Sequence, residues 1–359
     1  MKVLVTGGAG FIGSTVGSAL LDRGHVPVIL DDLSTGRESF TAGRAFYRGD
    51  VADGRLVDRI FAEHPDITAA VHCAGVIVVP ESVRQPLRYY RENLAKAVTL
   101  VGHLTRNGCH RVLFSSTAAL YRPGPDFAVD ETSPIDPTSP YARSKAMVEQ
   151  VLADAAAAGE VNVIALRYFN PIGADPLFRT GLQLRDPSHA LGRMIEAWHG
   201  GETFRVTGVG WPTRDGTAIR DYVHVWDLAE AHVAALTRFD EVVAAERAGF
   251  VALNVGTGAG TTVRELVAAF EEVTGAPLPY RETGPRPGDV AGVFNRSRLG
   301  QHLLRWQPRY GVTDAIRHAL RWREVDATSR PDPPRSGDSP APAAGLSGVG
   351  PAGRPPVAG

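Results

Sequence analysis

Short runs of β-branched and other apolar residues alternate with longer amphipathic stretches along the first half of the chain. The short runs predict strands at 2–6, 26–31, 69–73, 111–115 and 161–167. The longer stretches between them predict helices at 11–23, 54–64, 86–107 and 140–157. Strands that alternate with helices in this way form a parallel sheet covered on both faces. We therefore expect an α/β fold with a doubly wound parallel sheet of the Rossmann type.

The spacing of the elements loosens after residue 170, where proline and glycine become more frequent. Clear elements return at 223–237, 262–275 and 311–324. We therefore assign 1–170 to the Rossmann domain, with later elements from about 209–258 returning to it, and 171–325 mainly to a smaller mixed α/β substrate-binding cap. Residues 326–359 are rich in Pro, Gly, Ala and Ser. Such a segment buries too little apolar surface to offset its ordering entropy, so we predict a disordered tail.

Composition narrows the functional classes. The formal net charge of −1 gives no basic surplus for nucleic acid or an anionic membrane. Two cysteines are too few for a disulfide framework and suit a reducing compartment. The chain starts with a strand pattern in place of a signal peptide, and no run of about 18 apolar residues suggests a membrane helix. We expect a cytoplasmic protein, and the histidines have no metal-ligand spacing.

A glycine-rich turn links the first predicted strand to the first predicted helix. Gly7, Gly10 and Gly13 follow a G-x-x-G-x-x-G pattern. In this context the glycines allow a tight turn, close approach of a pyrophosphate to the backbone, and close packing of helix on strand. The helix N-terminus then offers free N–H groups to the phosphates. We expect Gly7, Gly10, Phe11, Ile12 and Gly13 to contact a dinucleotide.

The second predicted strand ends in Asp31, 18 residues after Gly13. An acidic residue there suits the two hydroxyls of an adenosine ribose and repels a 2′-phosphate, which favours NAD over NADP. We also expect Asp32 to contact the dinucleotide. Arg37 is close enough in sequence to weaken the preference for NAD over NADP. The alternative is a glycine-rich turn followed by an incidental aspartate.

Two more strand ends supply cofactor candidates. Asp50 and Val51 follow a short predicted strand, where an adenine ring is expected. Cys73, Ala74 and Gly75 end another strand, at the carboxyl edge where open α/β sheets bind ligands. We interpret Cys73 as a small buried residue, because no neighbour in the sequence would lower the pKa of its thiol.

Tyr141 and Lys145 lie four residues apart in a predicted helix, and hence on one helical face. A free tyrosine has a pKa near about 10, and a neighbouring ammonium together with a nicotinamide cation would favour its phenolate. Tyr141 can then remove a proton from a substrate hydroxyl as hydride leaves the same carbon. Ser115 and Thr117 close the preceding strand, and we expect Ser115 to contact the cofactor and Thr117 to hold that hydroxyl. Chance occurrence of Y-x-x-x-K on the surface is the alternative.

From residue 1 to about 323 the chain resembles the extended short-chain dehydrogenase/reductase family, and within it the UDP-glucose 4-epimerases. The resemblance is carried by segments 5–13, 81–83, 86–87, 139–141, 167–171, 220–225 and 286–289. It implies that Asn93 and Tyr168 border the cofactor and that Phe169 and Asn170 line the sugar. It also implies that Arg220, Arg286 and Asp289 hold the nucleotide diphosphate and its ribose, for which arginine supplies bidentate, permanently charged donors.

The resemblance implies an NAD-dependent nucleotide-sugar 4-epimerase of the UDP-glucose/UDP-galactose type, which acts through a transient 4-keto sugar. A 4,6-dehydratase of the same family needs an acid and a base directly after Thr117, where this chain has Ala118 and Ala119. Another nucleotide-sugar dehydrogenase, epimerisation at a different carbon, and a non-catalytic NAD-binding regulator remain as alternatives. The family also implies a homodimer formed through 86–107 and 140–157.

Several positions depart from the common epimerase pattern, all on the substrate side. His189 lies where an Asn-Asn-Leu motif is usual, and Thr207 replaces an aromatic residue that stacks on uracil. Loss of that ring would remove roughly 1 kcal/mol of stacking and leaves the base open. Val293 occupies a gatekeeper position at which a bulky tyrosine restricts the pocket, so a larger, N-acetylated sugar is a plausible substrate.

Overall fold

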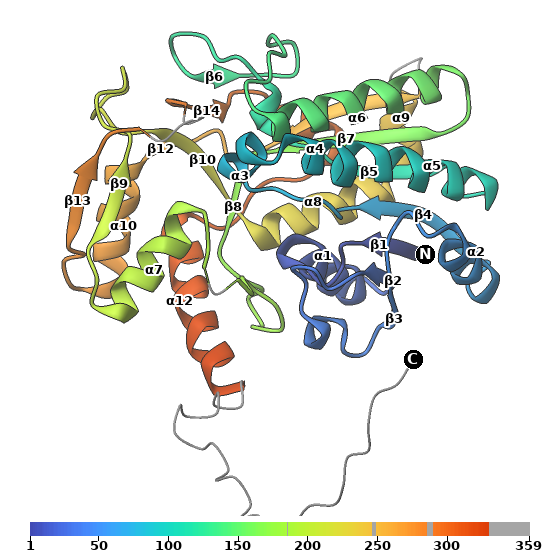
Figure 1. The fold of residues 1–359 in the computed structure, drawn as a ribbon, viewed down its shortest axis with the longest axis horizontal. Helices are drawn as coiled ribbons and strands as arrows, with labels where there is room; N and C mark the ends of the chain where they lie inside the picture. The colour runs from blue at the N-terminus through green and yellow to red at the C-terminus, as the bar shows by residue number, and fades with distance from the viewer. Residues whose placement is uncertain (185, 246–248, 286–289, 330–359) are drawn as a thin grey trace, which may run out of the picture.

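The computed structural model describes residues 1–184, 186–245, 249–285 and 290–329. Its largest sheet has seven strands in the order β11-β7-β5-β4-β1-β2-β3 (Figure 1). These strands are β1 (Lys2–Thr6), β2 (Val26–Asp31), β3 (Ala45–Arg48), β4 (Ile67–His72), β5 (Arg111–Ser115), β7 (Asn162–Tyr168) and β11 (Phe250–Val255). Every neighbouring pair is parallel. The predicted doubly wound α/β sheet is confirmed.

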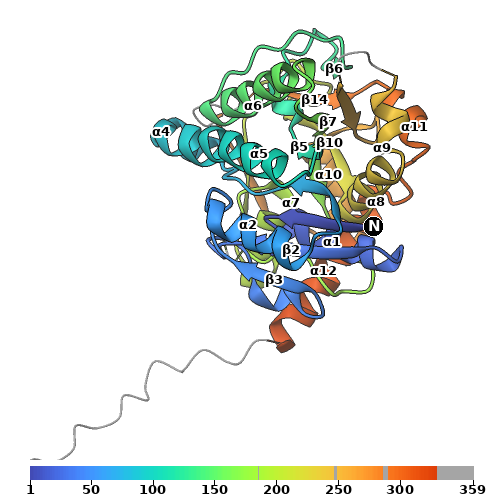
Figure 2. The same ribbon diagram turned by 90° about the vertical axis from the view of Figure 1, so that its right-hand side faces the viewer.

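Helices cover both faces of this sheet because its strands are apolar on both sides. Val3 and Val5 of β1 pack into one core, with α1 (Phe11–Asp22) and α8 (Val225–Thr237). Leu4 packs into the other core, beneath three helices. These helices are α2 (Gly54–Glu63), α5 (Lys96–Arg106) and α6 (Pro140–Ala157). Figure 2 shows α5 and α6 on one side of the sheet and α8 on the other.

A smaller mixed unit lies beside the carboxyl edge of the sheet (Figure 1). One of its sheets has the order β12-β10-β14-β6, with β8 paired to β10, and the other pairs β13 with β9. The strands are β6 (Ala128–Val129), β8 (Asn170–Ile172), β9 (Phe204–Thr207), β10 (Ile219–His224), β12 (Gly260–Thr262), β13 (Tyr280–Thr283) and β14 (Gly292–Asn295). Helices α7 (Ala190–Gly200), α10 (Val263–Thr274) and α12 (Val312–Ser329) share a core with β8, β9 and β10.

Two predicted elements differ from the structure by more than two residues. The helix expected at 86–107 is divided into α4 (Pro86–Tyr89), a π-helical turn at Tyr90–Ala95, and α5. Single π-helical turns of this kind often occur at functional sites. Helix α12 continues to Ser329, so residues 326–329 are helical and do not belong to a disordered tail. Residues 330–359 lie outside the described part of the chain.

The described residues also form five short helices. They are η1 (Glu38–Thr41), α3 (Val79–Arg84), η3 (Ala118–Leu120), α9 (Phe239–Val243) and α11 (Leu299–Leu304). Strand β11 and helix α8 belong to the large sheet and its covering layer, although both follow the first cap elements in sequence. Across the described ranges, none of the helices combines the length and apolarity that a membrane span needs.

Candidate active site

A cleft of about 1320 Å³ runs between the carboxyl edge of the seven-stranded sheet and the smaller unit. Its walls come from the loops after β1, β2, β4, β5 and β7 on one side, and from β8, α7, β9, β10 and β14 on the other. Pockets for one drug-sized ligand typically enclose about 300–1,000 Å³. The cleft therefore has room for a dinucleotide and a second ligand.

The glycine-rich turn forms one end of this cleft and has no space for side chains. A Cβ atom on Gly7 would lie 2.6 Å from the Ala74 nitrogen, and one on Gly13 would lie 2.3 Å from the Gly7 oxygen. Gly7 also has φ of +67°, which glycine adopts most readily. Helix α1 begins directly after Gly10, so its free N–H groups point into the cleft region that a pyrophosphate would need.

Asp31 lies at the end of β2, on the wall of the same cleft. Its carboxylate accepts hydrogen bonds from the backbone nitrogens of Ala9 (2.9 Å) and Leu33 (2.8 Å). Burial raises the pKa of Asp31, and these two hydrogen bonds act in the opposite direction. The neighbouring Asp32 also lines the cleft and accepts from the Ser34 nitrogen at 2.8 Å. The glycine-rich turn and this fixed carboxylate together fit a dinucleotide whose adenosine ribose has both hydroxyls free of phosphate.

The other strand ends meet at the same place. Asp50 and Val51 line the cleft, and Asp50 accepts a 2.6 Å hydrogen bond from Lys96, which lowers its pKa. Cys73, Ala74 and Gly75 line it beside the glycine turn. The Cys73 thiol lies 3.1 Å from the Ser115 hydroxyl, and burial raises the pKa of this thiol to about 11. Cys73 is therefore a protonated packing residue, as its sequence context predicted.

Asn93 and Ser115 lie behind the cleft wall and do not line it. The Asn93 side chain accepts from the Val76 nitrogen (2.8 Å) and donates to the Val76 oxygen and the Ser144 hydroxyl (both 3.0 Å). It thus fixes the loop after β4 against α6, and it is placed there by the π-helical turn that the sequence pattern did not reveal. Contact of Asn93 or Ser115 with a cofactor stays a prediction, whereas Tyr168 does line the cleft.

Thr117, Tyr141 and Lys145 line the centre of the cleft. Helix α6 begins at Pro140, with Ser139 as its N-cap, so Tyr141 lies in the first turn and Lys145 one turn later. Lys145 Nζ donates to the Ser115 carbonyl oxygen at 2.9 Å and lies 4.7 Å from the centre of the Phe114 ring. These contacts hold the ammonium beneath the site in one orientation.

The electrostatics of this group differ from the expectation in one respect. Burial raises the pKa of Tyr141, and only its hydrogen bond with Thr117 acts to lower it. The expected lowering by Lys145 is not found, because the lysine is itself buried and directed at the Ser115 oxygen. Burial lowers the pKa of Lys145 to about 8. In the protein alone, then, Tyr141 is a protonated phenol at neutral pH.

A buried ion pair joins α6 to β7, and the sequence pattern did not indicate it. Arg167 Nε of β7 lies 3.0 Å from Glu149 Oε1 of α6, one turn beyond Lys145. Glu149 also accepts a hydrogen bond from Ser116 at the end of β5, and Arg167 Nη1 donates to the Tyr121 hydroxyl at 2.9 Å. Both partners are about 5% exposed. The pair fixes α6 relative to β5 and β7.

Most of the predicted substrate residues lie on the wall formed by the smaller unit. Phe169, Asn170, His189, Thr207, Arg220 and Val293 all line the cleft. Arg220 donates to the backbone oxygens of Ile219 (2.7 Å) and Ala291 (2.9 Å), which orients its guanidinium. Arg286 and Asp289 lie outside the described residues. The structure thus brings these six candidates to one cleft, and their contact with a substrate stays a prediction.

His189 and Trp211 add information that the sequence pattern did not give. His189 caps α7 by accepting from the Gly192 nitrogen at 3.1 Å, and burial lowers its pKa to about 4, so it is neutral. Trp211 also lines the cleft, four residues beyond Thr207, and its indole nitrogen is buried without a hydrogen-bond partner among the described residues. A tryptophan directly after the Gly-Val-Gly segment 208–210 was the available signal.

Comparisons with known proteins agree with this geometry. A sequence profile described as "NAD dependent epimerase/dehydratase family" matches residues 3–256. The UDP-glucose 4-epimerase of Azospirillum brasilense is 43% identical over 324 residues, which cover 89% of this chain and 91% of that protein.

Two solved structures share the whole architecture. UDP-glucose-4-epimerase from Stenotrophomonas maltophila, with bound NAD and formylated UDP-arabinopyranose, superposes with a TM-score of 0.86 at 36% identity and covers 92% of this chain and 100% of that one. UDP-glucose 4-epimerase from Bifidobacterium longum, in complex with NAD+ and UDP, superposes with a TM-score of 0.84 at 32% identity and covers 91% and 99%.

Proposed function

The chain belongs to the NAD dependent epimerase/dehydratase family, and from that membership we propose that it interconverts the C4 epimers of a UDP-sugar, as UDP-glucose 4-epimerases do. One observation carries the proposal. Thr117, Tyr141 and Lys145 meet in a cleft whose far end is built for a dinucleotide. Relatives bound to NAD with a UDP-sugar, or with UDP, match nearly the full length of the chain.

NAD, when bound, accepts a hydride from C4 of the sugar and returns it. Gly7, Gly10 and Gly13 would hold its pyrophosphate, and Asp31 its adenosine ribose, because these residues offer a close backbone and a fixed acceptor. The acidic side chain of Asp31 favours NAD over NADP.

Tyr141 is the group that moves the proton. Its phenolic oxygen takes the proton from the sugar 4-hydroxyl and later returns it to the 4-keto oxygen. Thr117, which lines the cleft with Tyr141, holds the reacting oxygen in line. Lys145 contributes a positive charge at a fixed position, which favours the phenolate once a substrate and cofactor exclude water from the site. The 4-keto sugar must turn over between the two hydride transfers, and the cleft volume allows this.

The residues after Thr117 argue against dehydration. A 4,6-dehydratase needs a second proton donor and acceptor near C5 and C6 of the sugar. Ala118 and Ala119 line the cleft at that point, and neither side chain can transfer a proton. Epimerisation needs only the one proton carrier that Tyr141 provides.

The nucleotide end of the cleft suits a pyrimidine diphosphate. Arg220 supplies a guanidinium for the diphosphate, and Trp211 supplies a ring on which uracil can stack. Arg286 and Asp289 remain predicted contacts. At the sugar end, Val293 packs with Ala118, Tyr121 and Phe169 and leaves more room than a tyrosine would. We propose that this room admits an N-acetylated sugar.

Two further parts of the proposal concern assembly and location. Helices α5 and α6 carry exposed apolar side chains at Val98 (44%), Met147 (43%) and Val151 (37%), which suit a homodimer contact. Light scattering on the purified chain would report its mass, and Val151→Glu should shift a dimer to monomer.

Cys73 and Cys109 are unpaired, which suits a cytoplasmic location.

A substrate panel tests the function directly. We expect incubation with UDP-glucose or UDP-galactose, without added NAD, to give the C4 epimer detectable by proton NMR. dTDP- and GDP-sugars in parallel report the choice of base. Accumulation of NADH, or a 4-keto-6-deoxy product, would replace the proposal with a dehydrogenase or a dehydratase. Stoichiometric NAD with no turnover on any sugar would indicate a non-catalytic regulator.

A further inference from the structure

Arg37 lies on the loop that follows Asp31 and is fixed beside the predicted ribose site. Its backbone nitrogen donates to the Ala9 oxygen at 2.9 Å, within the glycine-rich turn. The preceding residue, Gly36, is packed so closely that an added Cβ would lie 2.7 Å from Asp31 Oδ1. An arginine this near the ribose carboxylate is where NADP-binding folds place the cation for the 2′-phosphate.

The Arg37 guanidinium is paired with a carboxylate from the far end of the chain. Asp326, in the last turns of α12, is 3% exposed and faces the guanidinium with both oxygens. Arg37 Nη2 donates to Asp326 Oδ2 at 3.1 Å, and Nη1 donates to Oδ1. The arrangement is bidentate, which is the geometry that arginine also uses with phosphate. Asp326 therefore occupies the same two donors that a 2′-phosphate would need.

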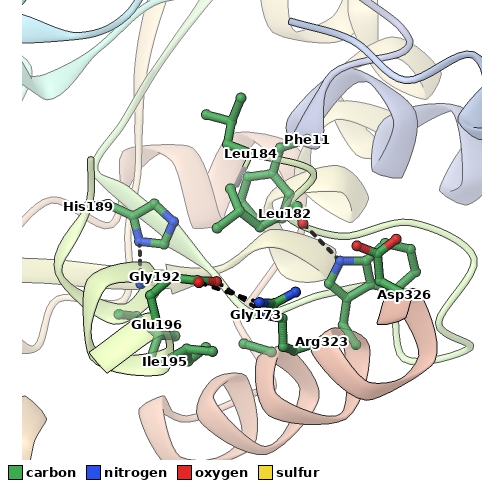
Figure 3. A pocket seen from close by; sticks show the side chains of 13 residues that line it. Phe11, Gly173, Leu182, Leu184, His189, Gly192, Ile195, Glu196, Arg323 and Asp326 are labelled. Atoms are coloured by element: carbon green, nitrogen blue, oxygen red, sulfur yellow. Dashed lines mark hydrogen bonds and ion pairs between the residues drawn. The ribbon is translucent and has the colours of Figure 1, made fainter. Parts of the chain in front are cut away.

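Aromatic packing keeps this pair in place. The Arg37 guanidinium carbon lies 5.1 Å from the centre of the Phe40 ring, and the Phe40 and Trp322 rings lie 5.7 Å apart. Trp322 in turn donates from its indole nitrogen to the Leu182 oxygen at 3.0 Å. Figure 3 shows Asp326 and Phe11 on the wall of one small pocket, between α12 and the first turn of α1. The end of α12 is thus docked directly behind the dinucleotide site.

We propose that Asp326 determines the cofactor specificity of this chain. Its carboxylate holds the Arg37 guanidinium away from the ribose and thereby excludes NADP. This inference rests on the proposed function, in that it requires the cleft to bind a dinucleotide. Two carboxylates then share the discrimination. Asp31 repels a 2′-phosphate directly, and Asp326 neutralises Arg37, the cation that would attract it.

The test measures binding and needs no turnover. Asp326→Asn keeps the shape of the side chain and removes its charge. The full-length protein is stripped of bound dinucleotide and titrated calorimetrically with NAD and with NADP. The dinucleotides that co-purify with each variant are also quantified after unfolding. We expect Asp326→Asn to raise the affinity for NADP relative to NAD about tenfold, because a charge-assisted arginine–phosphate contact becomes possible.

Two further variants complete the test. In the Asp326→Asn background, Arg37→Gln should abolish the gain. In the wild-type background, Arg37→Gln should leave the NADP-to-NAD ratio unchanged, because Arg37 is already occupied. Glu324→Ala is the matched control, since Glu324 pairs with Arg321 on the exposed side of the same helix, and it should change neither affinity.

If Asp326→Asn still binds NAD and its affinity for NADP relative to NAD is unchanged, this inference is overturned and the proposed function is left intact. A changed ratio in Arg37→Gln alone would also overturn it, because Arg37 would then already contact the dinucleotide. Failure of the wild-type chain to bind either dinucleotide would overturn the proposed function and this inference with it. If Asp31→Ala relaxes the preference while Asp326→Asn does not, only the Asp326 role is wrong.

Discussion

Lys145 Nζ donates a 2.9 Å hydrogen bond to the carbonyl oxygen of Ser115. This hydrogen bond joins α6 to the end of β5. The same nitrogen lies 4.7 Å from the centre of the Phe114 ring. The lysine is 5% exposed, and burial lowers its pKa to about 8. The cation beneath the site is therefore fixed in position and still mostly protonated at neutral pH.

This pKa makes stability depend on pH in a defined window. Lys145 has a pKa of about 8 in the folded chain, against an ordinary value of 10.5 for a lysine side chain. Between these values the unfolded chain binds more protons, so the free energy of unfolding should rise with pH, by at most about 1.4 kcal/mol per pH unit. Below pH 8 both states are protonated, and this contribution should become constant.

The measurement is urea unfolding of wild type and Lys145→Met from pH 7 to 10. Other groups titrate equally in both proteins, so the difference between the two curves isolates the lysine. Above pH 8 we expect the free energy of unfolding of wild type to rise relative to that of the variant. Parallel curves would show that Lys145 titrates normally.

Tyr141→Phe should lower kcat by about 10²–10⁴, because only the proton acceptor is removed. The amount of NAD bound per chain and the free energy of unfolding should change little, since the ring and its packing remain. Epimer formation by NMR, with dinucleotide content measured on the same preparation, checks both expectations. Tyr280→Phe is the control, because Tyr280 is exposed and does not line the cleft.

Breaking the Glu149–Arg167 pair should be costly. Glu149→Leu leaves a buried guanidinium without its carboxylate, which typically destabilises by about 3–5 kcal/mol. The double variant Glu149→Leu/Arg167→Met should recover much of that loss but not full kcat, since the register of α6 is no longer fixed. Denaturant unfolding and kcat together report the two effects.

The exposed pair Asp186–Arg193 serves as the comparison. Asp186→Ala should change the free energy of unfolding by less than about 1 kcal/mol. An equal loss in both single variants would show that burial does not distinguish the pairs.

Gly13→Ala should impair NAD binding by more than about tenfold. The added methyl would lie 2.3 Å from the Gly7 oxygen, which is backbone and cannot move without opening the turn. Gly102→Ala is the matched control, because Gly102 lies in α5 and an added Cβ meets no atom within 4 Å. It should raise stability by about 0.5–1 kcal/mol and leave NAD binding unchanged.

Val293→Tyr should reduce kcat/KM for UDP-N-acetylglucosamine far more than for UDP-glucose. Val293 packs against Phe169 on the sugar side of the cleft, so a tyrosine would take the space an N-acetyl group needs. The ratio of the two kcat/KM values serves as its own control for folding. If that ratio does not change, Val293 does not select the sugar.

The sequence by itself determined the parallel sheet and the dinucleotide end of the cleft. Strand–helix alternation, the glycine spacing and Asp31 are local signals, in which a few adjacent residues dictate both the backbone conformation and the chemistry. The four-residue spacing of Tyr141 and Lys145 is local in the same sense, because one helix presents both side chains on one face.

Tertiary structure decided everything that depends on residues distant in the chain. Three features arise only when separate elements pack together: the Glu149–Arg167 pair, the place of Trp211 on the cleft wall, and the docking of Asp326 on Arg37. The pKa values of Tyr141 and Lys145 belong here too, because desolvation is set by the surrounding atoms and not by the neighbouring sequence. Residues 326–329, which composition assigned to a disordered tail, are helical for the same reason. A buried ion pair at Asp326 and aromatic packing at Trp322 supply contacts that composition does not record.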